Sequence, residues 1–405
     1  MSLFLEKSPG LNQKILIPTM FQRTTLCLYR FIILSVIAVF HLESHSHGIE
    51  IATPKGLLVT RNFPEIRNGI CSVNQIQLTS KQWFQISSME TAAPEIPKAG
   101  VLVFINGDHL RGTMLETDGD SITWQPNDRV KVNEPLRFPV SAVQEIVITQ
   151  ARQLPISQNI TDRDKVIFAH QTQLLGTVLT AKRSADELIV RSAERNQSLK
   201  LSEVSRIVWN PALQRKRPLP VSFDRIILRD GSRITLLKLS CDGKLITGST
   251  IFRQVISISC ADVFRIEHTE PTIVRLLPGQ PEPIANQRMS FFINQRFHIF
   301  CQGWQMEGGQ EISFNLKKKY ASFHARLGLD AITASRGSAQ IQILLDDIPV
   351  ELPNHGNFSG AEDSLLINIP LKNVSELKIR CLELAQPVQN NGLNVVNPVW
   401  IQLEK

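Results

Sequence analysis

The sequence predicts a mostly β protein, in which tandem small β-barrel repeats are followed by a C-terminal β-sandwich. Apolar and polar residues alternate with a period of two over many short segments, as in strands with one buried face. Asn-Gly and Asp-Gly turns punctuate these segments, as in successive hairpins. After residue 47, no segment shows a helical period over more than two turns.

The length and composition indicate a folded chain of two to four domains. The chain has 405 residues, of which 42% are hydrophobic and 20% are charged, and these values are typical of globular proteins. The formal net charge is +7, but the basic residues are scattered apart from residues 215–217 and 317–319. Because nucleic-acid-binding proteins concentrate basic residues on one face, we expect no nucleic-acid partner.

An apolar segment near the N-terminus predicts export. Residues 31–40 are apolar and follow Arg23 and Arg30, which is the pattern of an export signal too short to span a bilayer comfortably. We expect a signal peptide over residues 1–47, with Met20 as an alternative start. The protein would then be periplasmic, at the cell surface or secreted. The alternative is an uncleaved signal that anchors the chain as a transmembrane helix.

The cysteines and histidines predict neither a disulfide scaffold nor a metal site. Cys27 lies in the signal, and the other five cysteines are widely spaced with no C-x-x-C pair. We expect buried free thiols. Pairing in an oxidising compartment is the alternative, and the sequence does not select the partners. His41, His45 and His47 lie at the end of the signal without a second group of ligands nearby, so we expect no metal there.

A repeat lies between the signal and the C-terminal region. Three clear copies span residues 98–152, 160–211 and 221–272, and a weaker copy spans residues 48–97. Each clear copy opens with an apolar strand, a polar turn and a second strand. Each closes with a Val that is followed three residues later by an Ile, namely Val143 and Ile146, Val204 and Ile207, and Val263 and Ile266.

These repeats predict small, strongly bent sheets of about five strands each, which resemble Sm-like or SH3-like barrels. The spacing of three between Val and Ile suits a short helical turn and a last strand better than one flat strand, since a flat strand alternates every two residues. We expect these Val and Ile side chains to be buried at equivalent places. Proline-rich linkers at residues 92–97, 211–220 and 277–283 separate the units.

The C-terminal region, residues 285–405, predicts a β-sandwich. Phe323 and Ala325 alternate with His324 and Arg326, which places one set of side chains in a core and the other outside. Further apolar positions alternate with polar neighbours in the same way, at Ile312, Phe314, Leu316, Ile341, Ile343, Leu377 and Ile379.

The same region resembles the NPCBM family of carbohydrate-binding modules, which occurs in family 98 glycoside hydrolases and other exported proteins. The family's F-x-A-x-x-G-x-D strand and turn matches Phe323, Ala325, Gly328 and Asp330, and a strand with an Asp-led turn follows at Asp346. The resemblance implies a galactose-binding-like jelly roll that binds glycan through its loops and is not a catalyst.

Two departures from the family pattern bear on ligand binding. The family's opening K-G-L-G-V-H strand corresponds to residues 302–307, where only Gly303 is kept. Its acidic closing loop corresponds to residues 390–394, which contain no carboxylate. Because Ca²⁺ takes several carboxylate oxygens, we expect no tight calcium site and no cofactor. If family ligands depend on these positions, sugar binding is lost as well.

The candidate glycan contacts combine aromatic rings with polar groups, because a ring can stack on a sugar while amides and imidazoles bond its hydroxyls. The candidates are Trp304, Asn354, His355, Asn357, Phe358 and Trp400. For two of these residues we favour a structural role, in which Phe358 packs inwards from a surface turn and Trp400 closes the end of the sandwich, because a single aromatic residue is usually part of the core.

No catalytic constellation stands out in the sequence. It lacks the G-x-S-x-G, H-E-x-x-H and phosphate-binding glycine motifs. Asp346 and Asp347 end a strand, where Asp more often shapes a turn. We therefore expect a non-enzymatic binding protein of the cell envelope, with glycan or envelope polysaccharide as its ligand. The alternatives are an envelope scaffold that binds protein partners through its repeats, and an accessory chain of a divergent glycosidase.

Overall fold

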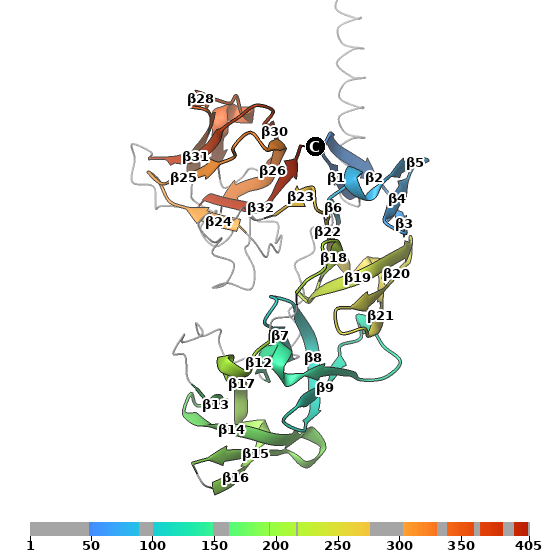
Figure 1. The fold of residues 1–405 in the computed structure, drawn as a ribbon, viewed down its shortest axis with the longest axis vertical. Coiled ribbons are helices and arrows are strands. Elements are labelled where there is room, and N and C mark those ends of the chain that lie inside the picture. The colour runs from blue at the N-terminus through green and yellow to red at the C-terminus, as the bar shows by residue number, and fades with distance from the viewer. Residues whose placement is uncertain are drawn as a thin grey trace, which may run out of the picture. The chain divides into compact units, whose positions relative to one another are not determined.

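The computed structural model describes residues 48–88, 100–148, 162–193, 195–215, 218–275, 303–329, 338–359, 365–383 and 393–403. These residues belong to one compact unit that spans Gly48–Lys405. They form three antiparallel sheets (Figure 1), and the predicted mostly β class is confirmed. The predicted signal, Cys27, Cys301 and Asp330 lie outside the described residues. Within the described ranges, no helix is long and apolar enough to cross a membrane.

Four copies of one strand pattern make up the largest sheet. Copy 1 consists of β1 (Ile49–Thr53), β2 (Gly56–Thr60), β3 (Glu65–Arg67), β4 (Ile70–Val73), β5 (Ile76–Leu78) and β6 (Gln85–Ser88). Copy 2 consists of β7 (Gly100–Phe104), β8 (His109–Thr117), β9 (Ser121–Pro126), β10 (Val130–Lys131), β11 (Leu136–Pro139) and β12 (Val143–Val147).

The other two copies follow the same order. Copy 3 consists of β13 (Asp164–Phe168), β14 (Gln173–Lys182), β15 (Glu187–Ser192), β16 (Arg195–Lys200) and β17 (Val204–Val208). Copy 4 consists of β18 (Phe223–Leu228), β19 (Arg233–Asp242), β20 (Leu245–Thr250), β21 (Val255–Ser259) and β22 (Val263–Thr269). A 3₁₀ turn precedes each last strand, at Ser80–Gln82, Val140–Ala142, Leu201–Glu203 and Cys260–Asp262.

A β-bulge explains the spacing of three between Val and Ile. Val143 pairs with Phe104 and Glu145 pairs with Val103, so Gln144 is skipped in the register. The extra residue reverses the alternation within the strand, and Val143 and Ile146 therefore face the same core. Both side chains are buried, as are the corresponding Val and Ile residues of copies 3 and 4.

The ring of hydrogen-bonded strands closes between copies and not within one copy. In copies 2 and 3 the ring runs β7–β12–β17–β13–β14–β8 and returns to β7. In copies 1 and 4 the pairing runs β2–β1–β6–β22–β18–β19–β3, and residues 61–64 connect β2 to β3 along the chain. The sequence predicts a separate barrel for each copy. Pairing between copies covers two strand edges that each copy would otherwise expose.

At each junction the two repeat isoleucines face each other. Ile146 pairs with Ile207 across β12 and β17, and Ile86 pairs with Ile266 across β6 and β22. All four side chains are fully buried. Trp83 takes the place of the repeat Val in copy 1, which the sequence marks only weakly. Its last strand is nevertheless paired like the others.

The two pairs of copies are nested along the chain. Copies 2 and 3 are neighbours in sequence and pair with each other. Copies 1 and 4 precede and follow them in sequence and also pair with each other, as the adjacent blue and yellow strands show in Figure 1. The pairs are linked by β10 with β21 and by Arg233 with His109. The Nε2 atom of His109 also lies 2.6 Å from the carbonyl oxygen of Gly231.

A buried cluster of charges lies on the opposite face of the junction between copies 1 and 4. Arg265 and Glu267 of β22 form an ion pair with 3.1 Å between Nε and Oε1, and both side chains are at most 3% exposed. Burial alone would raise the pKa of Glu267, but Arg265, Arg275, Arg233 and Arg225 lower it to about 2. Glu267 is therefore ionised in the folded protein at neutral pH.

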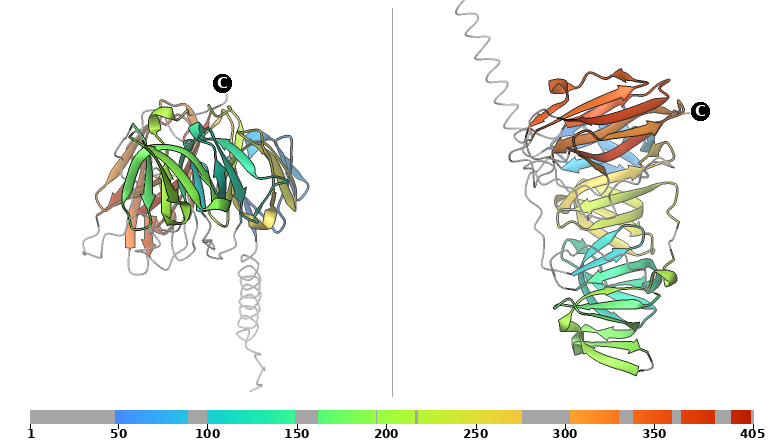
Figure 2. Two further views of the ribbon diagram at one scale, coloured as in Figure 1. Left: turned by 90° about the horizontal axis from the view of Figure 1, so that it is seen from below. Right: turned by 90° about the vertical axis from the view of Figure 1, so that its left-hand side faces the viewer.

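The C-terminal sandwich consists of two sheets of five strands. The first contains β23 (Ile273–Val274), β24 (Gly303–Met306), β26 (Tyr320–Leu329), β30 (Leu365–Pro370) and β32 (Leu393–Gln402). The second contains β25 (Glu311–Asn315), β27 (Ser338–Leu345), β28 (Ile348–Pro349), β29 (Asn357–Ser359) and β31 (Glu376–Leu382). Figure 2 shows the two layers. β23 lies before the predicted start at residue 285 but pairs with β32.

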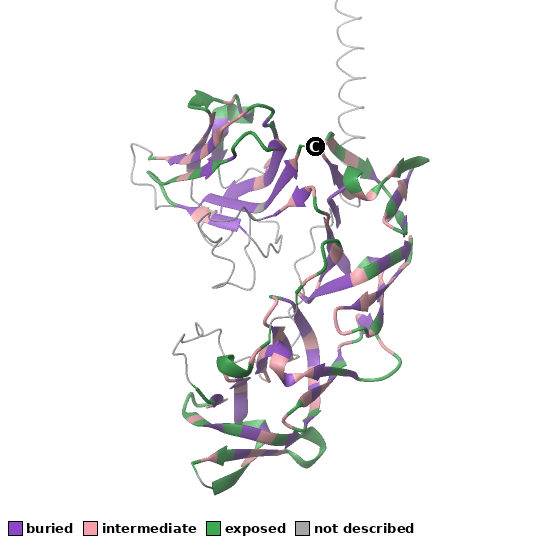
Figure 3. Cartoon of the chain, viewed as in Figure 1, coloured by how far each residue is buried: buried purple, intermediate pink, exposed green. Residues whose placement is uncertain are grey.

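The predicted alternation fills the core between these sheets. Phe314, Leu316, Ile341, Ile343, Leu377 and Ile379 are at most 2% exposed, and Ile312 is partly buried against them. β26 and β32 are coloured as buried over most of their length in Figure 3. The outer face of these two strands contacts copy 1, where Arg326 Nη2 donates to Glu50 Oε2 at 2.8 Å.

We expect the two junction isoleucines to be coupled energetically. Ile146→Ala and Ile207→Ala should each cost about 2–4 kcal/mol of unfolding free energy, because each opens a cavity in the core. The double variant should deviate from additivity by about 0.5–3 kcal/mol, since the side chains are in register. Urea unfolding measures these values. Ile146→Ala with Ile266→Ala, at the other junction, should be additive, and Gln144→Ala should cost almost nothing. If Ile146 were coupled to Ile266 as strongly as to Ile207, the direct contact between Ile146 and Ile207 at the junction would be contradicted.

Two buried histidines predict that stability falls in mild acid. Burial lowers the pKa of His324 to about 4, and burial and Arg233 lower the pKa of His109 to about 4. The unfolded chain takes up these protons near pH 6.5, so the stabilising contribution is complete above pH 6.5 and is lost as the pH falls towards 4.

Urea unfolding between pH 4 and 7 tests this prediction. His324→Gln should reduce the slope of unfolding free energy against pH by up to about 1.4 kcal/mol per pH unit, which is the value for one proton. Gln144→Ala, which removes no titratable group, is the control and should leave the slope unchanged. An unchanged slope for His324→Gln would show that the buried imidazole does not govern this pH dependence.

Candidate functional site

A polar loop on the second sheet of the sandwich carries three of the predicted contacts. It runs from the 3₁₀ turn Pro353–Gly356 into β29. Asn354 and His355 both have φ of 51°, a left-handed conformation that Asn and His tolerate better than most residues. Asn354, His355 and Asn357 are exposed. The loop therefore presents two amides and an imidazole to solvent.

Gly356 fixes the shape of this loop. Its φ is +74°, and an added Cβ would lie 2.1 Å from the carbonyl oxygen of Ile341. The loop thus passes against β27 at a place that only glycine fits. Asn357 Nδ2 then donates to the carbonyl oxygen of Asn354 at 2.9 Å, which leaves its Oδ1 available as an acceptor. The run Asn-His-Gly is the sequence signal for such a turn.

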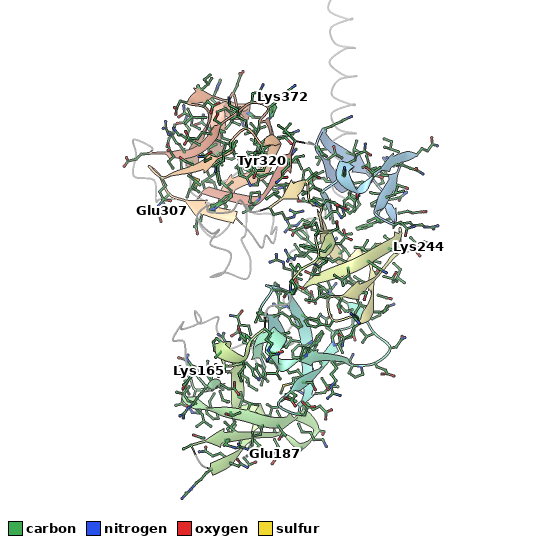
Figure 4. All side chains as sticks on the ribbon, in the orientation of Figure 1. Lys165, Glu187, Lys244, Glu307, Tyr320 and Lys372 are labelled. Carbon is green, nitrogen blue, oxygen red and sulfur yellow. The ribbon has the colours of Figure 1, made fainter. Side chains whose placement is uncertain are left out.

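The three aromatic candidates are core residues. Trp304, Phe358 and Trp400 are 4%, 6% and 0% exposed. Trp400 packs against Phe323 with ring centroids 4.3 Å apart, and against Tyr320, which is labelled in Figure 4, at 5.9 Å. Their ring faces are covered by the sandwich, so the structure gathers the polar candidates at the surface and leaves the aromatic ones inside.

Asp346 and Asp347 form the turn between β27 and β28. Both have positive φ, and Asp346 Oδ1 accepts hydrogen bonds from the backbone N–H groups of Ser375 and Glu376 at 3.0 and 2.8 Å. Asp347 Oδ1 pairs with Lys378 Nζ at 2.6 Å. These contacts hold the loop before β31 in place. Both carboxylates therefore have a structural role in a turn, which is the role that the sequence predicts for them.

An apolar cavity of about 20 Å³ lies between copies 2 and 4. Phe104, Phe138 and Phe252 line it, with ring centroids 4.9–5.3 Å apart. Asp108 lines one side of the cavity, and its carboxylate accepts hydrogen bonds from the backbone N–H and the hydroxyl of Thr235. This volume holds about one water molecule, so it is too small for a sugar. In the part of the chain that the structure describes, no group of three or more His, Cys, Asp or Glu residues is placed to hold a metal ion.

Comparison with known proteins places a family match over this site. Residues 287–391 match the NPCBM/NEW2 domain, a range that includes the loop at residues 353–359. A search of curated proteins found no match.

Solved structures of carbohydrate-binding modules are similar to parts of the chain. One is CBM51 from Clostridium perfringens GH95 in complex with methyl-galactose, with 13% identity over 32% of this chain and 91% of that chain and a TM-score of 0.26. Another contains the tandem CBM51 modules of a family 98 glycoside hydrolase from Streptococcus pneumoniae, with 10% identity over 75% and 88% and a TM-score of 0.28. These alignments have low scores, so the inference of glycan binding rests on the family match and not on them.

We expect Gly356→Ala to displace the loop. The added Cβ collides with the Ile341 backbone and the positive φ disfavours Ala, so the unfolding free energy should fall by about 1–3 kcal/mol. Gly308→Ala is the control, because its nearest contact would be an ordinary 3.5 Å, and it should change stability by less than about 0.5 kcal/mol. Urea unfolding compares the two. Equal effects would mean that Gly356 is not constrained.

Proposed function

We propose that this chain is a non-catalytic glycan-binding protein that contacts its ligand through the loop at residues 353–359. The match of residues 287–391 to the NPCBM/NEW2 domain carries the proposal. The exposed polar groups of Asn354, His355 and Asn357 support it, because amides and imidazoles can donate to and accept from sugar hydroxyls. With the candidate aromatic rings buried, the contact is small and polar, and the affinity is correspondingly weak.

We also propose that the chain is exported to the cell envelope. The apolar segment at residues 31–40 behind Arg23 and Arg30 supports export, as does the resemblance to a family common in exported proteins. N-terminal sequencing of the protein from its native host tests this. A mature chain that starts between residues 44 and 50 agrees with the proposal, and one that keeps residues 31–40 indicates a membrane anchor.

A protein scaffold is the second candidate function. Copy 1 exposes four aliphatic side chains, Leu57, Val59, Ile70 and Ile76, which are 40–48% exposed. Apolar surface of this kind favours protein contacts over sugar contacts. In this alternative the repeats bind protein partners and the sandwich has lost its affinity for sugar.

Titration of the full chain against a glycan panel separates the two functions. We expect millimolar to high-micromolar binding to at least one glycan. Asn354→Ala and His355→Ala should each weaken it about fivefold, the equivalent of one hydrogen bond of about 1 kcal/mol. Lys372→Ala, at an exposed position between β30 and β31 (Figure 4), is the control and should have no effect. The absence of binding at millimolar glycan would favour the scaffold, and binding that neither loop variant weakens would exclude this loop.

A further inference from the structure

Two thiols face each other in copy 4. The Sγ atoms of Cys241, in β19, and Cys260, in the 3₁₀ turn after β21, lie 3.4 Å apart. Both side chains are buried, with 1% and 8% exposure. Cys241 pairs with Ile246, and Ile246 pairs with Ile258, two residues before Cys260. Both side chains belong to the same buried apolar cluster, so both cysteines point into one core.

The turn between β19 and β20 holds the two thiols in place. The backbone N–H of Cys260 donates to the carbonyl oxygen of Lys244 at 2.8 Å, and the N–H of Gly243 donates to Cys241 Sγ at 3.3 Å. A covalent bond between the sulfurs is about 2.05 Å long. To form this bond, the two sulfurs must approach each other from their present separation of 3.4 Å.

We propose that Cys241 and Cys260 are a redox pair that forms a disulfide with a low-molecular-weight disulfide, such as glutathione disulfide, as the oxidant. The Cys241 thiolate attacks one glutathione sulfur, forms a mixed disulfide and releases one glutathione thiolate. The Cys260 thiolate then attacks the Cys241 sulfur and releases the second. The two cysteine protons are taken up by the two released thiolates, so one glutathione disulfide is reduced to two glutathiones.

The order of attack follows from the backbone N–H of Gly243, which donates to Cys241 Sγ at 3.3 Å and stabilises the thiolate of that cysteine. The contact with Cys260 lowers the pKa of Cys241 although burial raises it, and the Gly243 N–H lowers it further. The same contact and burial raise the pKa of Cys260. Cys241 is therefore the first nucleophile. Since both sulfurs are buried, the exchange accompanies folding or a local opening of the sheet.

A third buried thiol shares this core but is a weaker competitor. Ile66 pairs with both Cys71 and Cys241, so Cys71 lies two strands away from Cys241. Burial, and then the charge of Cys241, raise the pKa of Cys71 to about 12. It therefore stays protonated while Cys241 reacts. Cys381 is buried in the core of the sandwich and shares no element with this pair.

Thiol mapping of the full chain tests the proposal. The protein is equilibrated in glutathione buffers of increasing disulfide content, quenched in acid, alkylated and digested with trypsin. Cleavage after Lys244 and Arg253 separates the two cysteines, so a disulfide appears as two linked peptides. We expect this linked product to rise and saturate, while Cys71 and Cys381 are alkylated. Cys71→Ser should keep the product, and Cys241→Ser and Cys260→Ser should each abolish it.

Thermal unfolding gives a second readout on the unmodified chain. The disulfide closes a loop with a sequence separation of 19 residues, and its reduction should lower Tm by roughly 5–10 °C. Two results would overturn the proposal: complete alkylation of both cysteines in wild-type protein across the whole series, or linkage of Cys71 to either of them. Both are read on the wild-type chain, so misfolding of a variant does not obscure them. The outcome is independent of glycan binding, because the pair lies outside the sandwich.

Discussion

Antiparallel pairing of the last strands is the interaction on which the repeat region depends. Each copy has a bent sheet with open edges, and an isolated edge exposes unpaired backbone N–H and C=O groups. At the junctions, Ile146 meets Ile207 and Ile86 meets Ile266 in register. Backbone hydrogen bonds and burial of apolar side chains therefore act at the same positions, and the β-bulge that turns each repeat Val inwards keeps both apolar positions of the strand in the core.

Because the pairs of copies are nested, the pairing between copies 1 and 4 joins segments that are far apart in the sequence. Copy 1 is completed by copy 4, so the strand at residues 85–88, which pairs with β1 of its own copy, gains its second partner, β22, only after the intervening copies have been synthesised. Contacts of this sequence separation are slow to form because the loop entropy must be paid first. The buried ion pair between Arg265 and Glu267 lies on the same junction, where loss of one partner would leave a buried charge.

The sandwich shows how the core and the surface compete for aromatic residues. Trp304, Phe358 and Trp400 fill the space between its sheets, and burying such large side chains contributes more to stability than their exposure could contribute to weak stacking. The surface left for a ligand is polar. Asn354 and His355 reach it through left-handed backbone conformations, and Gly356 allows that loop to pass against β27.

The sequence by itself determined the strands, the repeat and the inner face of the sandwich, because alternation records which side chains are buried. Phe314, Ile343 and Leu377 were assignable to the core on this basis, and Asn354, His355 and Asn357 were assignable as polar candidates for ligand contact. Only the tertiary structure decided that Ile146 meets Ile207, that copy 1 pairs with copy 4, that β23 joins the sandwich, and that Cys241 faces Cys260. The alternation of apolar and polar residues specifies which face of a strand is buried. It does not specify which strand lies beside it, because every backbone offers the same N–H and C=O groups for pairing. The packing of the whole chain therefore selects the neighbouring strand.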